Sequence, residues 1–162
     1  MTNYNSGIKI TEVRVSNFRS LKDVVVKLDD ITLLIGANNA GKTNFLDAIS
    51  VAIGSYRQIL NADDIYIGPD EKEVSKDRKA VIDIFIRPTD SAGNVIDAFP
   101  AAGFWTGHWG DAISQDESMA DFIGIRSMLL WSPVNKSYRL ERRFLKDLVE
   151  PPEWIGAAEK GP

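Results

Sequence analysis

The stretch that most constrains this chain is "GANNAGKT", residues 36–43, because of what stands on either side of it. The apolar run "ITLLI" lies directly before it and predicts a strand that is buried on both faces. Behind it, apolar residues recur at helical spacing as far as Gly54, a residue type that often ends helices: Phe45, Leu46, Ile49, Ala52 and Ile53. A strand, a glycine-rich turn and a helix therefore follow one another.

Within this stretch, Gly36, Gly41, Lys42 and Thr43 match the pattern G-x-x-x-x-G-K-[ST] of phosphate-binding loops, and the surrounding elements are those that the pattern requires. In such a loop, backbone N–H groups and the helix N-terminus attract an anion. We expect the two glycines to allow positive φ and a close approach of backbone to phosphate. Lys42 is expected to reach the β- and γ-phosphates, and the Thr43 hydroxyl to take one Mg²⁺ position. The expected cofactors are ATP and Mg²⁺.

Composition indicates the class of protein but not its partner. The chain has 162 residues, 44% hydrophobic and 26% charged, which is typical of one globular domain. It contains no cysteine, and its N-terminus does not resemble a signal peptide, so we expect a cytoplasmic protein. No apolar run approaches the roughly 20 residues that span a bilayer. The net charge of −4 gives no general attraction for nucleic acid, so any DNA contact requires a local patch or a partner.

The remaining elements are mostly strands. "IKITEVRV" alternates in two phases and predicts a bulged strand, and "LKDVVVKL" predicts a second with Val24, Val26 and Leu28 on one face. Three more strands are predicted from "AVIDIFIRP", "FIGIRSMLLW" and "SYRLERRFL". We interpret 89–118 as a long loop with a short helix near "GDAISQDESMADF". The predicted organisation is one partial domain, with P-loop core elements in 1–56, a β-subdomain with long loops in 57–150, and a tail in 151–162 that frays or crosses to an absent partner.

Two strands with an "NFRS" turn, followed by "ITLLIGANNAGKTNFLDAI", resemble the N-terminal segment of the RecF and SMC branch of ABC-type ATPases. The resemblance is greatest to OLD-family (overcoming lysogenization defect) ATP-dependent endonucleases, and the close match covers about residues 8 to 53. It implies an α/β P-loop NTPase fold: the first lobe of an ABC-type ATPase head with an antiparallel β-subdomain. It also implies phage defence or DNA repair as settings.

The same resemblance implies the roles of further site residues. Asn39 lies beside the γ-phosphate and Arg19 approaches the nucleotide, while Asn38, Ala40 and Asn44 complete the binding loop. From the residues alone, Arg19 is equally well a solvated surface charge. Asn44 either caps the helix or touches the α-phosphate.

Several parts of a working ATPase or nuclease are not found in the sequence. No apolar strand ends in Asp–Glu, because Asp83 stands mid-strand without a neighbouring acid. The Ser-Gly-Gly signature and an Asp-x-Asp metal set are also absent. Neither Gln58 nor Gln115 follows a clear strand, as the Mg²⁺-contacting glutamine of this family does. His108 is interpreted as a loop histidine packed between Trp105 and Trp109 rather than a catalytic one.

The segment "RLERRF" places Arg139, Glu141 and Arg143 on one strand face and Arg142 on the other. This face is either a small basic patch for a phosphate backbone or, more simply, a solvated charged face.

Three hypotheses follow: an ATPase head fragment of an ATP-dependent nuclease or DNA-maintenance machine, a nucleotide-binding regulatory module without turnover, or an interaction protein with a relic P-loop. The intact loop residues argue against the third. In the first two, a second copy or a companion chain supplies the second ATPase lobe, and DNA is bound only by the full assembly.

Overall fold

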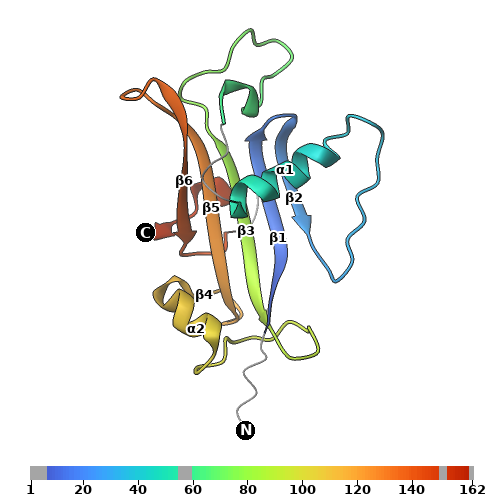
Figure 1. Ribbon diagram of the computed structural model, residues 1–162, viewed down its shortest axis with the longest axis vertical. Helices are drawn as coiled ribbons and strands as arrows, with labels where there is room; N and C mark the ends of the chain where they lie inside the picture. The colour runs from blue at the N-terminus through green and yellow to red at the C-terminus, as the bar shows by residue number, and fades with distance from the viewer. Residues whose placement is uncertain (1–6, 55–59, 150–152, 161–162) are drawn as a thin grey trace.

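One antiparallel sheet organises the described residues of the computed structural model, which are 7–54, 60–149 and 153–160 (Figure 1). The strand order is β2-β1-β3-β5-β6-β7, with β4 paired to β5. The strands are β1 Gly7–Phe18, β2 Leu21–Lys27, β3 Ala80–Thr89, β4 Ser114–Gln115, β5 Asp121–Ser132, β6 Ser137–Leu145 and β7 Glu159–Lys160. The helices are α1 Lys42–Ile53 and α2 Phe104–Trp109, with short 3₁₀ turns η1 Ala62–Asp64, η2 Gly110–Ala112 and η3 Glu153–Gly156.

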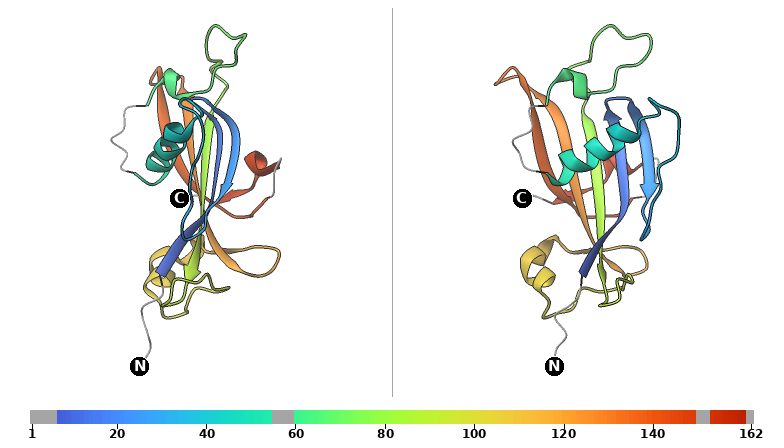
Figure 2. Two further views of the ribbon diagram at one scale, coloured as in Figure 1. Left: turned by 90° about the vertical axis from the view of Figure 1, so that its right-hand side faces the viewer. Right: turned by 45° about the vertical axis from the view of Figure 1, so that its right-hand side comes forward.

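The two α-helices lie on one face of the sheet, and the C-terminal segment with η3 lies on the other (Figure 2). No helix of the described residues is long and apolar enough to cross a membrane. Both β1 and β2 belong to the same sheet as β3, β5 and β6, so the strands before and after the P-loop form one continuous layer.

Five of the predicted strands are confirmed, as β1, β2, β3, β5 and β6, including the irregularity in the first. The pairing of β1 with β3 shifts register between Ile10 and Glu12, which is the bulge that the two-phase alternation of "IKITEVRV" predicts. In β2, Val24 and Val26 pack against the main core, as does Leu28 just beyond it. The alternation of apolar and polar residues therefore predicted β1 and β2 correctly.

The main core lies between α1 and the sheet. Its centre is formed by side chains that are at most 5% exposed, and these come from β1, β3 and α1: Val13, Val15, Ile82, Ile84, Phe45, Ala48, Val51 and Ala52. Burial of this apolar surface holds α1, and with it the P-loop, across the sheet.

The opposite face of the sheet carries buried charge. Arg14 on β1, Asp83 on β3 and Arg126 on β5 are register partners in neighbouring strands and are at most 1% exposed. Their cover is the C-terminal segment, whose Trp154 is 1% exposed and packs with Val81 and Met128.

The prediction of a fraying tail is therefore wrong for the described residues 153–160. Trp154 is buried, and β7 pairs with the end of β6. The backbone oxygens of Trp154 and Ile155 accept hydrogen bonds from Arg126 at 2.5 and 2.8 Å, which fixes the segment to the sheet. Sequence composition could not reveal these contacts, because they depend on an arginine far away in the chain.

The prediction for "ITLLI" is also wrong in this structure. The segment is not a strand, and Ile31, Leu33 and Ile35 are 90%, 77% and 85% exposed. The sheet pairings of the described residues are all antiparallel and none includes residues 31–35. An apolar run becomes a buried strand only when neighbouring strands satisfy its backbone and other elements cover its faces.

The long loop predicted for 89–118 contains more structure than expected. The helix is α2 at residues 104–109, before the predicted position, and β4 follows at 114–115. His108 lies on this helix rather than in a loop, stacked on Phe104 at 5.8 Å between ring centroids and edge-on to Trp109. Trp105 and Trp109 stack on each other at 4.8 Å, so aromatic contacts stabilise a helix too short to form alone.

Candidate nucleotide-binding site

The P-loop, residues 36–43, runs into α1 through Gly41, the N-cap of the helix, and borders a cavity of about 510 Å³. The helix begins at Lys42, so the loop and the first turn of α1 face this space together. The lining residues are Ser20, Asn38, Asn39, Gly41, Lys42, Thr43 and Asn44. Their arrangement at a helix N-terminus is suited to binding an anion.

The backbone of the loop requires glycine at one position and small size at another. Gly41 has φ 86°, and a Cβ there would lie 2.8 Å from Leu21 Cδ2, so a side chain would strain the backbone and would also displace Leu21. At Gly36 the φ angle is not in the left-handed region, and the constraint is contact with Ala40, whose Cβ would be 3.2 Å away. The second positive φ of the loop belongs to Asn39, at 73°.

Lys42 folds back over the loop. Its Nζ donates to the carbonyl oxygens of Gly36 at 2.6 Å and Ala37 at 2.7 Å, while a further turn bond joins Ala40 N to Ala37 O at 3.1 Å. The ammonium is therefore held over the mouth of the loop, where a phosphate group would approach it. Thr43 is exposed and lines the same cavity, so its hydroxyl is accessible.

Arg19 is not among the residues that line the cavity, although its neighbour Ser20 is, and its side chain is held by two acids. Its Nε donates to Asp64 Oδ1 at 2.8 Å, its Nη1 to Asp47 on α1, and its backbone N to Asp64 O at 3.0 Å. Partial burial works against the guanidinium charge, but the bonds to Asp64 and Asp47 outweigh it and raise the pKa of Arg19 above its usual value. Arg19 thus joins α1 to the η1 segment, rather than being a free surface charge.

Ser20 is a site residue that the sequence analysis missed. Its Oγ accepts a hydrogen bond from Asn44 Nδ2 at 2.7 Å, and it lines the cavity from the β1–β2 turn. Of the two roles considered for Asn44, capping of the helix is not observed, because α1 has no side-chain cap and the Asn44 amide joins the helix to the turn instead. Its contact with the α-phosphate stays a prediction. The "NFRS" motif was a signal for this turn, but only the fold shows that its serine reaches the P-loop.

The far end of α1 is anchored by polar groups from the sheet. Arg142 on β6 donates through Nη2 to the carbonyl oxygens of Val51 and Gly54, both at 2.7 Å. Ser127 on β5 donates to Ala52 O at 3.3 Å. A cation at a helix C-terminus is favourable, so Arg142 fixes the helix that carries the P-loop.

The other charged residues considered from the sequence lie elsewhere. Asp83 is fully buried on the opposite face, where burial raises the pKa of its carboxyl against the opposing effect of Arg126. Arg139 and Arg143 are 54% and 44% exposed, and both pair with Glu141, which favours a solvated charged face. Gln115 lies on β4, and Gln58 falls outside the described residues.

Comparison with known proteins agrees with this geometry. Residues 8–141 match the model of the AAA ATPase domain family. The chain belongs to that family. The match includes the P-loop, α1 and the strands from β1 into β6.

Three relatives of the chain are a chromosome-maintenance protein, a DNA repair ATPase and a nuclease. This chain is 34% identical over 88 residues to Structural maintenance of chromosomes protein 1 of Arabidopsis thaliana, and the match covers 51% of this chain and 7% of that protein. It is 49% identical over 47 residues to the DNA double-strand break repair Rad50 ATPase of Pyrococcus abyssi, covering 28% and 5%. It is 40% identical over 45 residues to the OLD nuclease of Thermus scotoductus, covering 28% and 8%.

These relatives place the domain in the RecF and SMC branch of ABC-type ATPases. The chain spans less than a tenth of the length of each of the three. The similarity therefore covers only a small part of each of those proteins.

Proposed function

We propose that this domain binds ATP with Mg²⁺ at the P-loop cavity, as the N-terminal nucleotide-binding part of an OLD-like or SMC-like ATPase. The observation that carries the proposal is the cavity of about 510 Å³ at the N-terminus of α1, bordered by Lys42 and Thr43. Lys42 supplies the cation for the β- and γ-phosphates, and backbone N–H groups of the loop supply neutral donors. Arg19 is proposed to approach the nucleotide from the neighbouring turn after it releases one of the two carboxylates that it binds, Asp47 or Asp64.

The residues present fit a Mg²⁺ ion that arrives with the nucleotide. Thr43 offers one hydroxyl oxygen to the cavity, and phosphates and water would provide the remaining ligands. Among the described residues, no group of three or more acidic, histidine or cysteine side chains forms a metal site of its own. The ion would neutralise phosphate charge.

The proposed role in the cell is control of a DNA-cutting or DNA-maintenance module by nucleotide state. Its support is the relation to a chromosome-maintenance protein, a DNA repair ATPase and a nuclease. The second ATPase lobe is proposed to come from a companion chain or a second copy. The exposed apolar residues Ile31, Leu33 and Ile35 beside the P-loop support this, because such a surface favours a partner.

The alternative is a regulatory module that binds nucleotide without turnover until a partner chain completes it. One observation favours it: the residues that the described structure places around the cavity are all neutral or cationic. Orientation of an attacking water requires a base or an equivalent polar group. A phosphate-release assay tests this alternative, since ATPase-like turnover that Lys42→Ala abolishes would refute it.

Nucleotide binding itself is tested by titrating a fluorescent ATP analogue into the 162-residue chain with Mg²⁺. We expect weak binding that Lys42→Ala reduces by at least roughly tenfold, because the variant deletes a charge-assisted contact. Lys146→Ala, in which a lysine away from the cavity is removed, is the control and should bind as the wild type does. Absence of binding at millimolar nucleotide would refute the proposal.

A further inference from the structure

The turn between β1 and β2 forms a second wall of the candidate nucleotide site. At Gly41 the two walls meet: an added Cβ would lie 2.8 Å from Leu21 Cδ2 and 3.3 Å from Ser20 Oγ. Ser20 also borders the cavity that Lys42 and Thr43 line. The phosphate-binding loop therefore faces a side chain that lies outside its own sequence motif.

The hydrogen bond between Asn44 and Ser20 leaves one polar group unused. The Asn44 amide nitrogen can only donate, so at 2.7 Å the Ser20 oxygen is the acceptor and its own hydrogen is not involved. Among the described residues, no acceptor is recorded for that hydrogen. The hydroxyl is exposed at the edge of the cavity and can donate to a ligand there.

The turn is held rigidly enough to position this hydroxyl. Asn17 and Arg19 have φ of 54° and 48°, in the left-handed region that residues other than glycine rarely adopt. Phe18 between them is fully buried, and Arg19 is bonded to Asp47 and Asp64. Unfavourable backbone conformations persist where surrounding contacts enforce them, and they gather at functional sites. Ordering Ser20 for binding therefore costs little additional entropy.

We propose that Ser20 is a phosphate-contacting residue, whose hydroxyl donates a hydrogen bond to a phosphate oxygen of the bound nucleotide. A phosphate oxygen only accepts, which matches the one unused donor of this side chain. Asn44 positions Ser20 by bonding to its oxygen. The inference rests on the proposed nucleotide binding and adds the β1–β2 turn to the P-loop as a source of ligand contacts.

The test measures the affinities of ATP and of inorganic triphosphate for the whole chain by calorimetry. Ser20→Ala should weaken both by roughly tenfold, the size expected for a hydrogen bond to a charged group. Ser20→Thr keeps the hydroxyl and should retain most of the affinity. Ser50→Ala is the matched control, because that hydroxyl bonds to Leu46 O on the exposed side of the same helix, and it should have no effect.

The variants also separate contact from support. Asn44→Ala removes the bond between the two side chains but leaves the Ser20 hydroxyl, so adding Ser20→Ala in the double variant should weaken binding further. If the double variant bound no more weakly than Asn44→Ala alone, Ser20 would act only through Asn44, and a loss for ATP without a loss for triphosphate would exclude the phosphate contact. Binding that depends on Lys42 but not on Ser20 overturns this inference alone, whereas absence of any binding overturns the proposed function.

Discussion

The guanidinium of Arg126 on β5 faces the carboxylate of Asp83 on β3 in a two-pronged ion pair, with Nε–Oδ1 at 2.9 Å and Nη2–Oδ2 at 2.8 Å. Each side chain is only 1% exposed. The pair lies on the face opposite α1, beneath the C-terminal segment that Arg126 also holds through Trp154 O. It therefore joins the centre of the sheet to its cover.

Removing one member of this pair should be far more damaging than removing both. Asp83→Ala leaves a buried guanidinium without its carboxylate, and we expect it to lower the free energy of unfolding by about 3–5 kcal/mol. The double variant Asp83→Leu/Arg126→Met should be less destabilised than Asp83→Ala, because no buried charge is left unpaired. Urea unfolding measures both.

The control for this prediction is Arg139→Ala. That residue pairs with Glu141 but is 54% exposed, so its loss should change stability by less than about 1 kcal/mol. If Asp83→Ala cost no more than Arg139→Ala, the pair would have no particular importance for the fold.

Gly41 and Gly93 allow backbone strain to be separated from steric exclusion at the P-loop. Both have strongly positive φ, at 86° and 90°, but an added Cβ at Gly93 meets nothing within 4 Å. Gly93→Ala should therefore cost about 1–2 kcal/mol from strain alone and leave nucleotide affinity unchanged. Gly41→Ala should cost more, because the new Cβ also displaces Leu21, and it should remove nucleotide binding. Thermal unfolding measures the stability of the two variants, and nucleotide titration measures their affinity. If both variants lost the same stability, the close packing of Gly41 against Leu21 would be unimportant.

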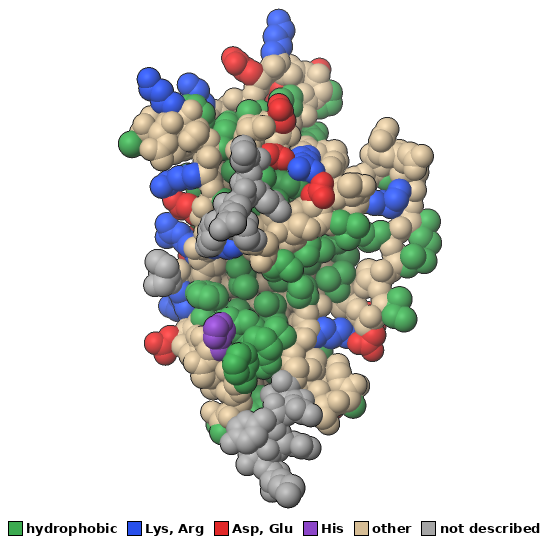
Figure 3. All heavy atoms as spheres, in the orientation of Figure 1, with side chains coloured by type: hydrophobic (Ala, Val, Ile, Leu, Met, Phe, Trp, Pro, Cys, Tyr) green, Lys and Arg blue, Asp and Glu red, His purple; other side chains and the backbone are tan. Residues whose placement is uncertain are grey.

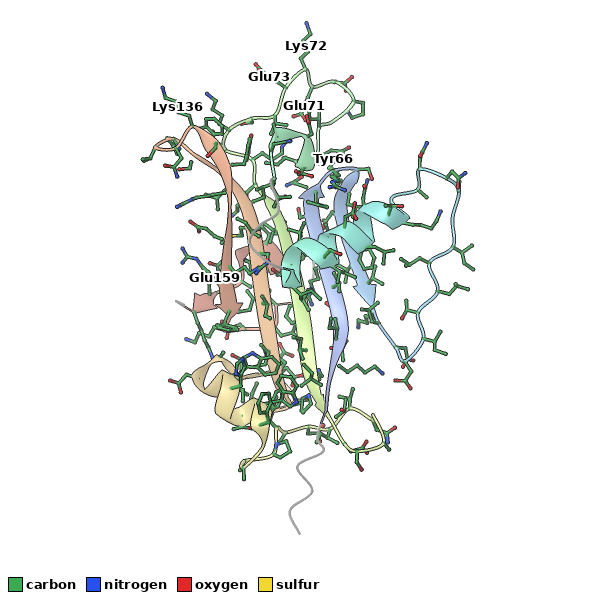
Figure 4. All side chains as sticks on the ribbon, in the orientation of Figure 1. Tyr66, Glu71, Lys72, Glu73, Lys136 and Glu159 are labelled. Atoms are coloured by element: carbon green, nitrogen blue, oxygen red, sulfur yellow. The ribbon has the colours of Figure 1, made fainter. Side chains whose placement is uncertain are left out.

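Glu71 forms a pH-sensitive contact in the loop that leads to β3 (Figure 4). Its carboxylate accepts from Arg78 at 2.5 and 2.6 Å and from Gly68 N at 2.7 Å, and these bonds, led by the one from Arg78, lower the pKa of Glu71 to about 2. A lowered pKa means that the contact is fully formed above the ordinary value of 4.5 and is lost as the pH falls toward about 2.

The chemical shift of the Gly68 amide, followed by NMR from neutral to acid pH, should therefore change with a midpoint near 2 rather than near 4.5. Glu71→Gln should abolish this transition, whereas Glu73→Gln, a substitution two positions along the same loop, should leave it in place. A midpoint near 4.5 in the wild type would mean that the Arg78 contact does not persist in solution.

Sequence patterns predicted those parts of the molecule that depend on local periodicity. The bulge in β1, the limits of α1 and the P-loop follow from residues that are neighbours in the chain, and the structure has them where they were expected. Ser20 and Arg142 could not be found in this way. Each reaches α1 from a distant strand or turn, and the distance in sequence hides the contact.

For the segment "ITLLI", by contrast, the local pattern predicted a strand that the structure does not have. Its composition correctly indicates a capacity for burial, but burial also requires partner strands, and the described residues provide none. Hydrophobic side chains also gather over the sheet between α1 and α2 (Figure 3), so the exposed segment is not the sole apolar surface on this side of the molecule. A sequence pattern states what a segment can form, whereas its neighbours decide whether it does.

The exposed segment leads to the last prediction, which concerns assembly. Ile31, Leu33 and Ile35 are at least 77% exposed, in an extended segment outside the sheet. Exposed apolar residues on backbone that is free to pair favour association with another strand. We expect the isolated chain to self-associate at tens of micromolar, and Leu33→Lys to reduce this association by placing a charge in the contact.

Val134→Lys is the matched control, because Val134 is 91% exposed in the turn between β5 and β6, away from this segment. Light scattering on the three proteins decides the matter: a wild-type monomer with a sharp cooperative melt would mean that residues 31–35 need no partner.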